Sequence, residues 1–297
     1  MGRVGDALSN GAHTWKQNPI LCAPFLLDAL AEFAFFILVL AGVAIAIGTD
    51  ALMEVATGFS ELAAVSQSYS GVGDPSLETM IEIMEGVYHS IVPFIEVYIA
   101  ASVIIVIGCA LIRSFFESGA IGMAKTATET GVTGMHDLFH SGRKSAIDLF
   151  LANIAIVLIV LAGIVFLVPG VLLFRTSGES ALSAAAIIVG FIMFALYMTI
   201  LGIGLLPVKY ALVVDNLNAI EGINRGWSFF SGHKLDVLLM FFVVFVIYML
   251  LGMIENAFHT TSITAQIWQL VGWVINVCVI MPLITVWWTR LYIMSKA

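Results

Sequence analysis

Residues 138–151, LFHSGRKSAIDLFL, and residues 229–242, FFSGHKLDVLLMFF, are two versions of one pattern. In each version a serine and a glycine precede two basic residues, and an aspartate, Asp148 or Asp236, follows within a few residues. A long apolar run then begins. About 20 mostly apolar residues are enough to cross a bilayer, so the pattern is typical of a polar break before a membrane span. A chain that contains it twice is expected to have repeated membrane-spanning units.

The composition of the chain supports this interpretation. Of its 297 residues, 61% are hydrophobic and only 11% are charged, whereas soluble domains have about 25% charged residues. A chain with so few charges cannot cover a surface that faces water, which indicates an integral membrane protein. The net charge of −8 argues against nucleic acid as a partner. The three cysteines lack the paired spacing of disulfide frameworks or zinc sites and are expected to be packing residues.

Six apolar stretches are long enough to span a membrane. They cover about 20–48, 91–113, 147–168, 182–206, 235–254 and 264–289. Eleven of the 12 basic residues lie before the first span, after the last, or between spans two and three and spans four and five; Arg175 lies on the other side. Because cytoplasmic loops hold the excess of Lys and Arg, both termini are predicted to be cytoplasmic. The fold is thus predicted to be an all-α, single polytopic domain over 1–297.

An amphipathic segment and a small polar break precede each odd-numbered span. The segments cover 1–17, 133–140 and 218–230, and the breaks are Asn18-Pro19, Ser141-Gly142 and Ser231-Gly232. A unit of one such helix and two spans keeps its direction when repeated, so we expect three parallel repeats. The repeats cover about 1–113, 133–209 and 218–290. The alternative is that any hairpin with an interfacial leading helix has this appearance by chance.

Aromatic and basic residues mark the expected cytoplasmic interface. Trp15 and Trp227 lie on the apolar stripes of two leading segments, and Arg113, Lys209 and Arg290 stand where the even-numbered spans end. Such side chains reach the head groups from positions near a helix end. We expect all five residues to act as interfacial anchors.

The first outer loop, 49–90, contains seven acidic residues and no basic one, and a helix is predicted at about 75–90. One face of this helix carries Glu78, Glu82, Glu85 and His89. These side chains are a weak candidate for a divalent-cation site. A solvated acidic face is favoured, because hard cations need more converging oxygens than one stripe provides. No metal or other cofactor is therefore expected.

Three carboxylates lie more than two residues inside the predicted spans. Asp28 and Glu32 are four residues apart and share a helical face, and Glu96 follows Pro93. A carboxylate at membrane depth costs several kcal/mol unless it faces the bundle interior, is paired or takes a proton. These residues could form the protonatable or cation-binding site of a coupled transporter. The alternative, slightly favoured, is a buried carboxyl group bonded to another helix, for which Asn153, Asn276, Ser102 and Thr285 are possible partners.

Residues 206–240, LPVKYALVVDNLNAIEGINRGWSFFSGHKLDVLLM, resemble the membrane domain named after glycerophosphoryl diester phosphodiesterase and related archaeal and bacterial six-span families of unknown function. The resemblance is clear over about 200–255 and weaker elsewhere. It implies a prokaryotic cell membrane, and favours an archaeal one. In the named enzymes catalysis belongs to a separate soluble domain. This chain contains none, so no catalytic residue is carried over.

Three functions remain open. The sequence contains no Walker-type glycine loop, no His-Glu-x-x-His and no Gly-x-Ser-x-Gly. This favours a non-enzymatic scaffold, assembly or lipid-interacting module, whose partners would be membrane lipids, other membrane proteins or a second copy. A transporter of ions or small solutes, using the intramembrane carboxylates, is the alternative. An enzyme that acts on lipids has the least support.

Overall fold

The computed structural model describes residues 2–68, 77–178, 180–257 and 262–296, and every regular element in this part of the chain is helical. Within these residues, six helices are long and apolar enough to cross a membrane, which confirms the predicted all-α membrane class. Helices satisfy their backbone hydrogen bonds internally, as a lipid environment requires. The six are Pro19–Ile47, Met80–Thr130, Met135–Thr176, Ala181–Asp215, Lys234–Ile254 and Ile267–Met294.

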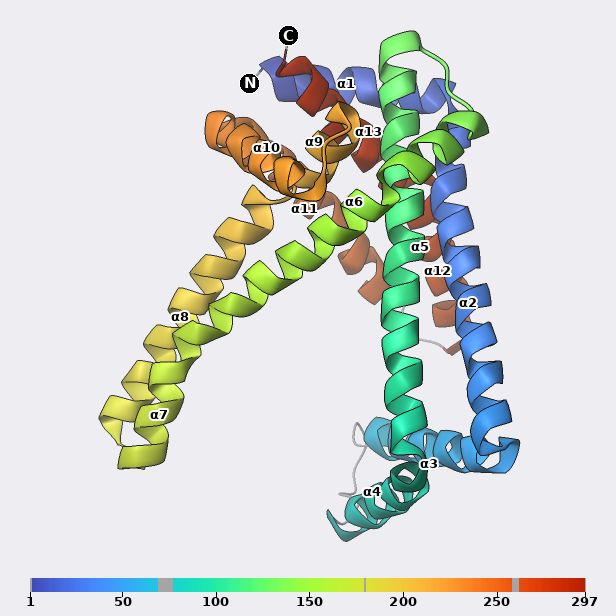
Figure 1. The fold of residues 1–297 in the computed structure, drawn as a ribbon, viewed down its shortest axis with the longest axis vertical. Coiled ribbons are helices and arrows are strands. Elements are labelled where there is room, and N and C mark those ends of the chain that lie inside the picture. Colours follow the sequence, from blue (N-terminus) through green and yellow to red (C-terminus); the bar gives the residue numbers. More distant parts are fainter. Residues whose placement is uncertain (1, 69–76, 179, 258–261, 297) are drawn as a thin grey trace. The chain divides into compact units, whose positions relative to one another are not determined.

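The chain divides into two compact units, and the smaller one covers Ala29–Ile112. Four helices and a short 3-10 turn supply it: α2 (Ala23–Ile47), α3 (Thr49–Ser68), α4 (Leu77–Ile91), η2 (Val92–Phe94) and α5 (Ile95–Thr130). Figure 1 shows α3 and α4 side by side, and Val87 of α4 packs where Gly58 of α3 has no side chain. Phe35 of α2 lies against Gly108 of α5 in the same way. Small residues therefore set both helix contacts.

The larger unit covers residues 1–28 and 113–297. It contains the ends of α2 and α5 together with α1 (Gly2–Gln17), η1 (Pro19–Cys22), α6 (Met135–Ala162), η3 (Gly163–Leu167), α7 (Val168–Ser177), α8 (Ala181–Gly204), α9 (Val208–Asp215), α10 (Ala219–Gly232), α11 (Lys234–Ala257), α12 (Ser262–Ile275), a π-helical turn η4 (Asn276–Ile280) and α13 (Met281–Met294).

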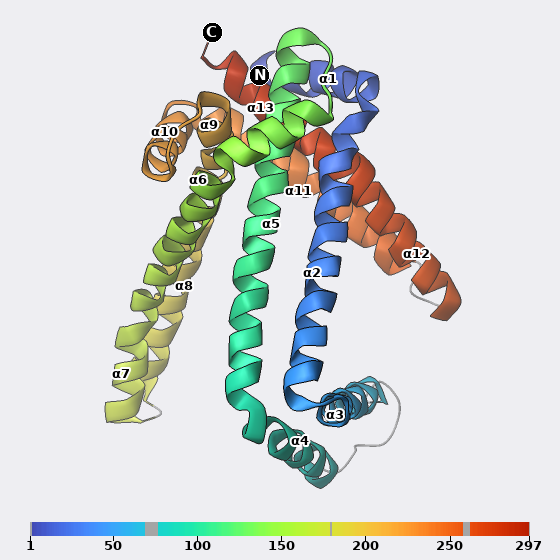
Figure 2. The same cartoon turned by 45° about the vertical axis from the view of Figure 1, so that its right-hand side comes forward.

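The core of this unit lies where the short helices α1, α9 and α10 pack with α6, α11 and α13. Figure 2 shows α1, α9, α10 and α13 close to both chain ends. Leu212, Trp288 and Leu291 are almost completely buried there. By contrast, no more than 28% of the residues in the most apolar stretch of any described span are buried. Within this unit, tight packing is thus concentrated around the short helices.

Of the three predicted leading segments, two form separate helices. α1 ends at Gln17 before Pro19, and α10 ends at Gly232 before α11 begins at Lys234. The expected break at Ser141-Gly142 is wrong, because α6 runs through it without interruption. Gly142 instead gives room for the ring of Phe115 on α5. The glycine therefore serves helix packing there. The threefold repeat and the orientation of the termini stay predictions.

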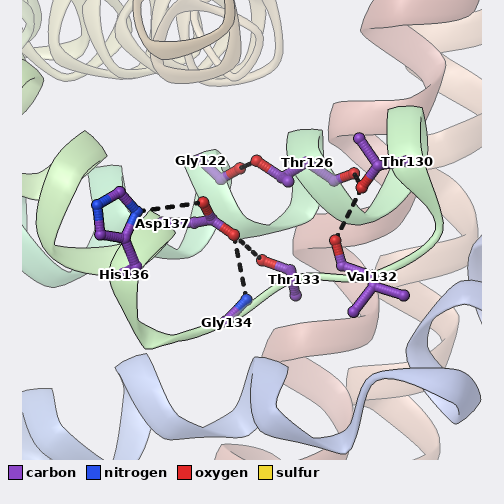
Figure 3. Close-up of polar contacts among 8 residues, drawn as sticks. All are labelled: Gly122, Thr126, Thr130, Val132, Thr133, Gly134, His136 and Asp137. Atoms are coloured by element: carbon purple, nitrogen blue, oxygen red, sulfur yellow. Dashed lines mark hydrogen bonds and ion pairs between the residues drawn. The ribbon is translucent and has the colours of Figure 1, made fainter.

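The connection between α5 and α6 is closed by a small hydrogen-bond network (Figure 3). The hydroxyl of Thr133 donates to Asp137 Oδ2 over 2.9 Å, and the Gly134 amide donates to the same oxygen over 3.1 Å. Asp137 stands in the first turn of α6. A carboxylate there accepts hydrogen bonds from unpaired amides and interacts favourably with the helix dipole. This network fixes where α6 begins.

Candidate functional site

Lys209 is the centre of the candidate site. α8 ends at Gly204, and α9 begins directly after Pro207, whose fixed φ suits a helix start. Lys209 Nζ lies 2.6 Å from Glu117 Oε1 of α5, and the two side chains are 33% and 24% exposed. Charged groups in an apolar setting are costly unless paired. The pair therefore holds α9 against α5.

A cavity of about 220 Å³ opens beside this ion pair. Arg113 lines it from α5, four residues before Glu117 and hence on the same helical face. Asp28 from α2 and Thr285 from α13 line it too, as do the tyrosines Tyr210 and Tyr248. Two cationic and two acidic side chains thus share one cavity. These charges balance formally, and apolar side chains such as Phe25 and Ile121 complete the lining; we call this the polar cavity because it holds the four charged groups.

Two grooves with mostly apolar linings adjoin the polar cavity. One, of about 380 Å³, includes Val157 of α6, and the other, of about 320 Å³, includes Phe245 of α11. Lys209 lines the cavity and both grooves. Val157 and Phe245 are 55% and 53% exposed, so each groove reaches an apolar outer surface. The ion pair therefore stands where polar and lipid-facing surfaces meet.

The three predicted intramembrane carboxylates lie in different places. Asp28 lines the polar cavity. Glu32 lies one turn further along α2, is partly buried, and is not part of the cavity lining. Glu96 is exposed in the first turn of α5, whereas Glu117 lies in the later half of that helix. Of the three, the structure brings only Asp28 to the Lys209–Glu117 pair.

The polar residues expected to partner these carboxylates are also spread out. Thr285 faces the same cavity as Asp28, although its hydroxyl donates to Met281 O of its own helix over 2.9 Å. Asn153 lines the groove beside Glu117. Ser102 donates to Tyr98 O of its own helix. Asn276 lies in the π-helical turn.

The predicted anchors take several roles. Arg113 is exposed beside the cavity and Lys209 is paired, as described above. Arg290 Nη1 donates to the hydroxyl of Thr14 over 3.0 Å, which fastens α1 to α13. Trp15 packs on the smaller buried cluster around Leu138. Trp227 is 39% exposed, and its ring lies 5.6 Å from that of Phe230.

The described side chains of the acidic face of α4 do not all line one groove. Glu82, Glu85 and His89 are exposed, and the side chain of Glu78 lies outside the described residues. Glu82 lines a groove of about 530 Å³ with Glu54 and Glu61 of α3, whereas Glu85 and His89 do not. Among the described residues, no group of three or more His, Cys, Asp or Glu side chains could hold a metal ion.

Sequence reasoning missed Glu117, although a signal for it existed. Its spacing from Arg113 is that of an ion-paired helix face, and the two residues lie at the end of the second span and just after it. It also missed Asp215, which accepts a hydrogen bond from the Tyr292 hydroxyl over 2.7 Å. Two partners of Asp215, Tyr292 and Lys296, lie far from it in the sequence, so no local pattern indicated these contacts.

Comparisons with known proteins extend over nearly the whole chain. The sequence profile of a family described as "Domain of unknown function (DUF7847)" matches residues 3–292. An uncharacterized protein of Archaeoglobus fulgidus is 25% identical over 304 residues, which cover 97% of this chain and 94% of the relative. No solved structure matches. Neither match shows the resemblance to the glycerophosphoryl diester phosphodiesterase membrane domain.

Proposed function

The chain belongs to the DUF7847 family, and on this premise we propose that it is a non-enzymatic, multi-pass membrane protein that holds an amphiphilic lipid beside Lys209. One observation carries the proposal. The same lysine lines a polar cavity and two apolar grooves. An amphiphile needs such a junction, because its head group requires hydrogen bonds and its tail requires apolar contact.

The chemistry of the cavity indicates the kind of head group. Arg113 and Lys209 offer donors and positive charge, while Glu117 and Asp28 offer acceptors and negative charge. A head group with both charges or with several hydroxyl groups suits this balance better than a purely anionic one. The tail would lie along the apolar groove of about 320 Å³ that Phe241 and Phe245 of α11 line.

A crosslinking experiment in proteoliposomes tests the proposal. A zwitterionic lipid with a diazirine in its acyl chain is expected to label groove residues on α11 and α13. Val244→Trp fills the groove lined by Val244 and should reduce this labelling at least fivefold. Leu250→Trp is the matched control, since Leu250 lies on the same helix, is 54% exposed and lines no part of the groove. Equal labelling in all three proteins would refute lipid binding in this groove.

A coupled transporter is the second candidate, favoured by the presence of Asp28 in the same cavity as an ion pair. Under the lipid-binding proposal, Asp28→Asn and Glu32→Gln proteins fold like the parent and proteoliposomes show no flux that depends on pH or cations. A flux in the parent that either substitution abolishes would favour the transporter. Labelling of a cysteine placed at Ala29 or Ala31 from the aqueous side would indicate the water path that a transporter requires.

A further inference from the structure

A second cavity, of about 400 Å³, lies between α10 and the end of α13. Arg225 and Ser228 line it from α10, His233 follows that helix, and Ser295 and Lys296 follow α13. None of its lining residues takes part in the cavity or grooves around Lys209. Whatever binds here therefore does so independently of the lipid proposed above.

Asp215 holds the basic side chains of this cavity in place. Its side chain is 17% exposed, pairs with Lys296 Nζ, and lies 3.8 Å from Arg225 Nε. The Tyr292 hydroxyl donates to Asp215 over 2.7 Å. Asp215 itself does not line the cavity. It thus stands behind the two cations and orients them, as a supporting carboxylate does at a preorganised site.

The cavity has an excess of positive charge. Among the described residues, Arg225 and Lys296 outnumber the one carboxylate that pairs with them, and no acidic side chain lines the cavity. Lys125 of α5 lies close by, since its Nζ donates to Val214 O over 2.9 Å. Arg and Lys together with a hydroxyl group, here that of Ser228, are the groups that recognise phosphate.

We propose that this cavity binds a phosphate group, carried by an anionic lipid. The lipid is favoured as the source because α10 is amphipathic. Ile220, 73% exposed, and Trp227, 39% exposed, lie on the face opposite the cavity residues, and this apolar face would hold the helix and its cavity at the membrane surface. Phe229, whose ring lies 4.9 Å from His233 and 5.1 Å from Tyr292, forms its aromatic wall. Basic pockets beside membrane helices attract anionic head groups in this way.

Native mass spectrometry of the full chain in detergent, with phosphatidylglycerol or phosphatidylcholine added, tests the proposal. Because the lipid proposed beside Lys209 is zwitterionic, the comparison is made with that groove filled by Val244→Trp, and this protein should retain phosphatidylglycerol at least tenfold more than phosphatidylcholine. Ser228→Glu places a carboxylate in the cavity and leaves the partners of Asp215 intact, so the protein should fold and lose this preference. Ser228→Ala should keep it.

A second pair of variants separates the cavity from charge in general. Arg225→Gln with Lys296→Gln removes two cavity cations, while Arg143→Gln with Lys144→Gln removes two exposed cations of α6. Only the first pair should lower phosphatidylglycerol retention, by at least tenfold. An equal loss in both pairs, or full retention by Ser228→Glu, would overturn the proposal.

Inorganic phosphate distinguishes the two sources of the group. If a lipid is the ligand, phosphate at millimolar concentration should displace bound phosphatidylglycerol only partly. Complete displacement, with thermal stabilisation of the parent that Ser228→Glu lacks, would keep the phosphate site but overturn the lipid as its source.

Discussion

Asn18 joins two parts of the chain that are far apart in sequence. Its side chain is almost completely buried, at 4% exposure. The amide nitrogen donates to Gly131 O and to Thr14 O, each over 3.0 Å, and the amide oxygen accepts from the Thr133 amide over 3.1 Å. One side chain thus satisfies backbone groups at the end of α1 and in the α5–α6 connection.

Asn18→Ala should destabilise the protein, because the Thr133 amide and the Gly131 carbonyl lose a buried partner. Each unsatisfied group costs about 1–3 kcal/mol, so we expect the free energy of unfolding to fall by about 2–4 kcal/mol. Thermal unfolding in detergent measures the change. Asn10→Ala is the control, since the Asn10 side chain is exposed. If Asn18→Ala lowers the unfolding temperature no more than Asn10→Ala does, the hydrogen bonds of Asn18 do not stabilise the protein.

Helices α5 and α6 approach closely at glycines. Gly119 faces Leu138, Gly122 faces Ser141, and Gly142 faces Phe115. Helix pairs in membranes gain stability from this kind of contact, because lipid tails provide no hydrophobic force between helices. The crossing explains why α6 continues through a serine and a glycine that resemble a break.

Gly142→Ala should disturb this crossing. A Cβ atom at Gly142 would lie 2.9 Å from the Phe115 ring and 3.1 Å from its carbonyl oxygen. Overpacking of this kind costs about 1–3 kcal/mol, measured as a lower midpoint of thermal unfolding. Gly252→Ala on α11 is the matched control, as nothing lies within 4 Å of its added Cβ. If both variants unfold at the same temperature as the parent, the close approach is unimportant.

For the whole molecule, the distribution of basic residues predicts cytoplasmic termini. Eleven of 12 lie on the side that would face the cytoplasm. An impermeant maleimide should therefore label a cysteine at Ser60, in α3, from outside intact cells. A cysteine in a C-terminal tag should react only after permeabilisation. The reverse pattern would mean that the chain is inserted with the opposite orientation.

The local pattern of the sequence was enough to predict the all-α class and the six spans. A span must be apolar along its whole length, and a helix closes its hydrogen bonds within a few residues, so both properties can be read from a short window. The separate helices α1 and α10 are also local features, since Pro19 and Gly232 interrupt the helical pattern directly.

The candidate sites depended on tertiary packing. Lys209 meets Glu117 across 92 positions and Lys296 meets Asp215 across 81. The continuity of α6 also depends on a residue of another helix, Phe115. Contacts between distant segments produce no periodic pattern in either segment. From its neighbours alone, each basic residue is interpreted as a membrane anchor and each glycine as a break. Only the tertiary structure determines which basic side chain pairs with a carboxylate and which glycine packs against an aromatic ring.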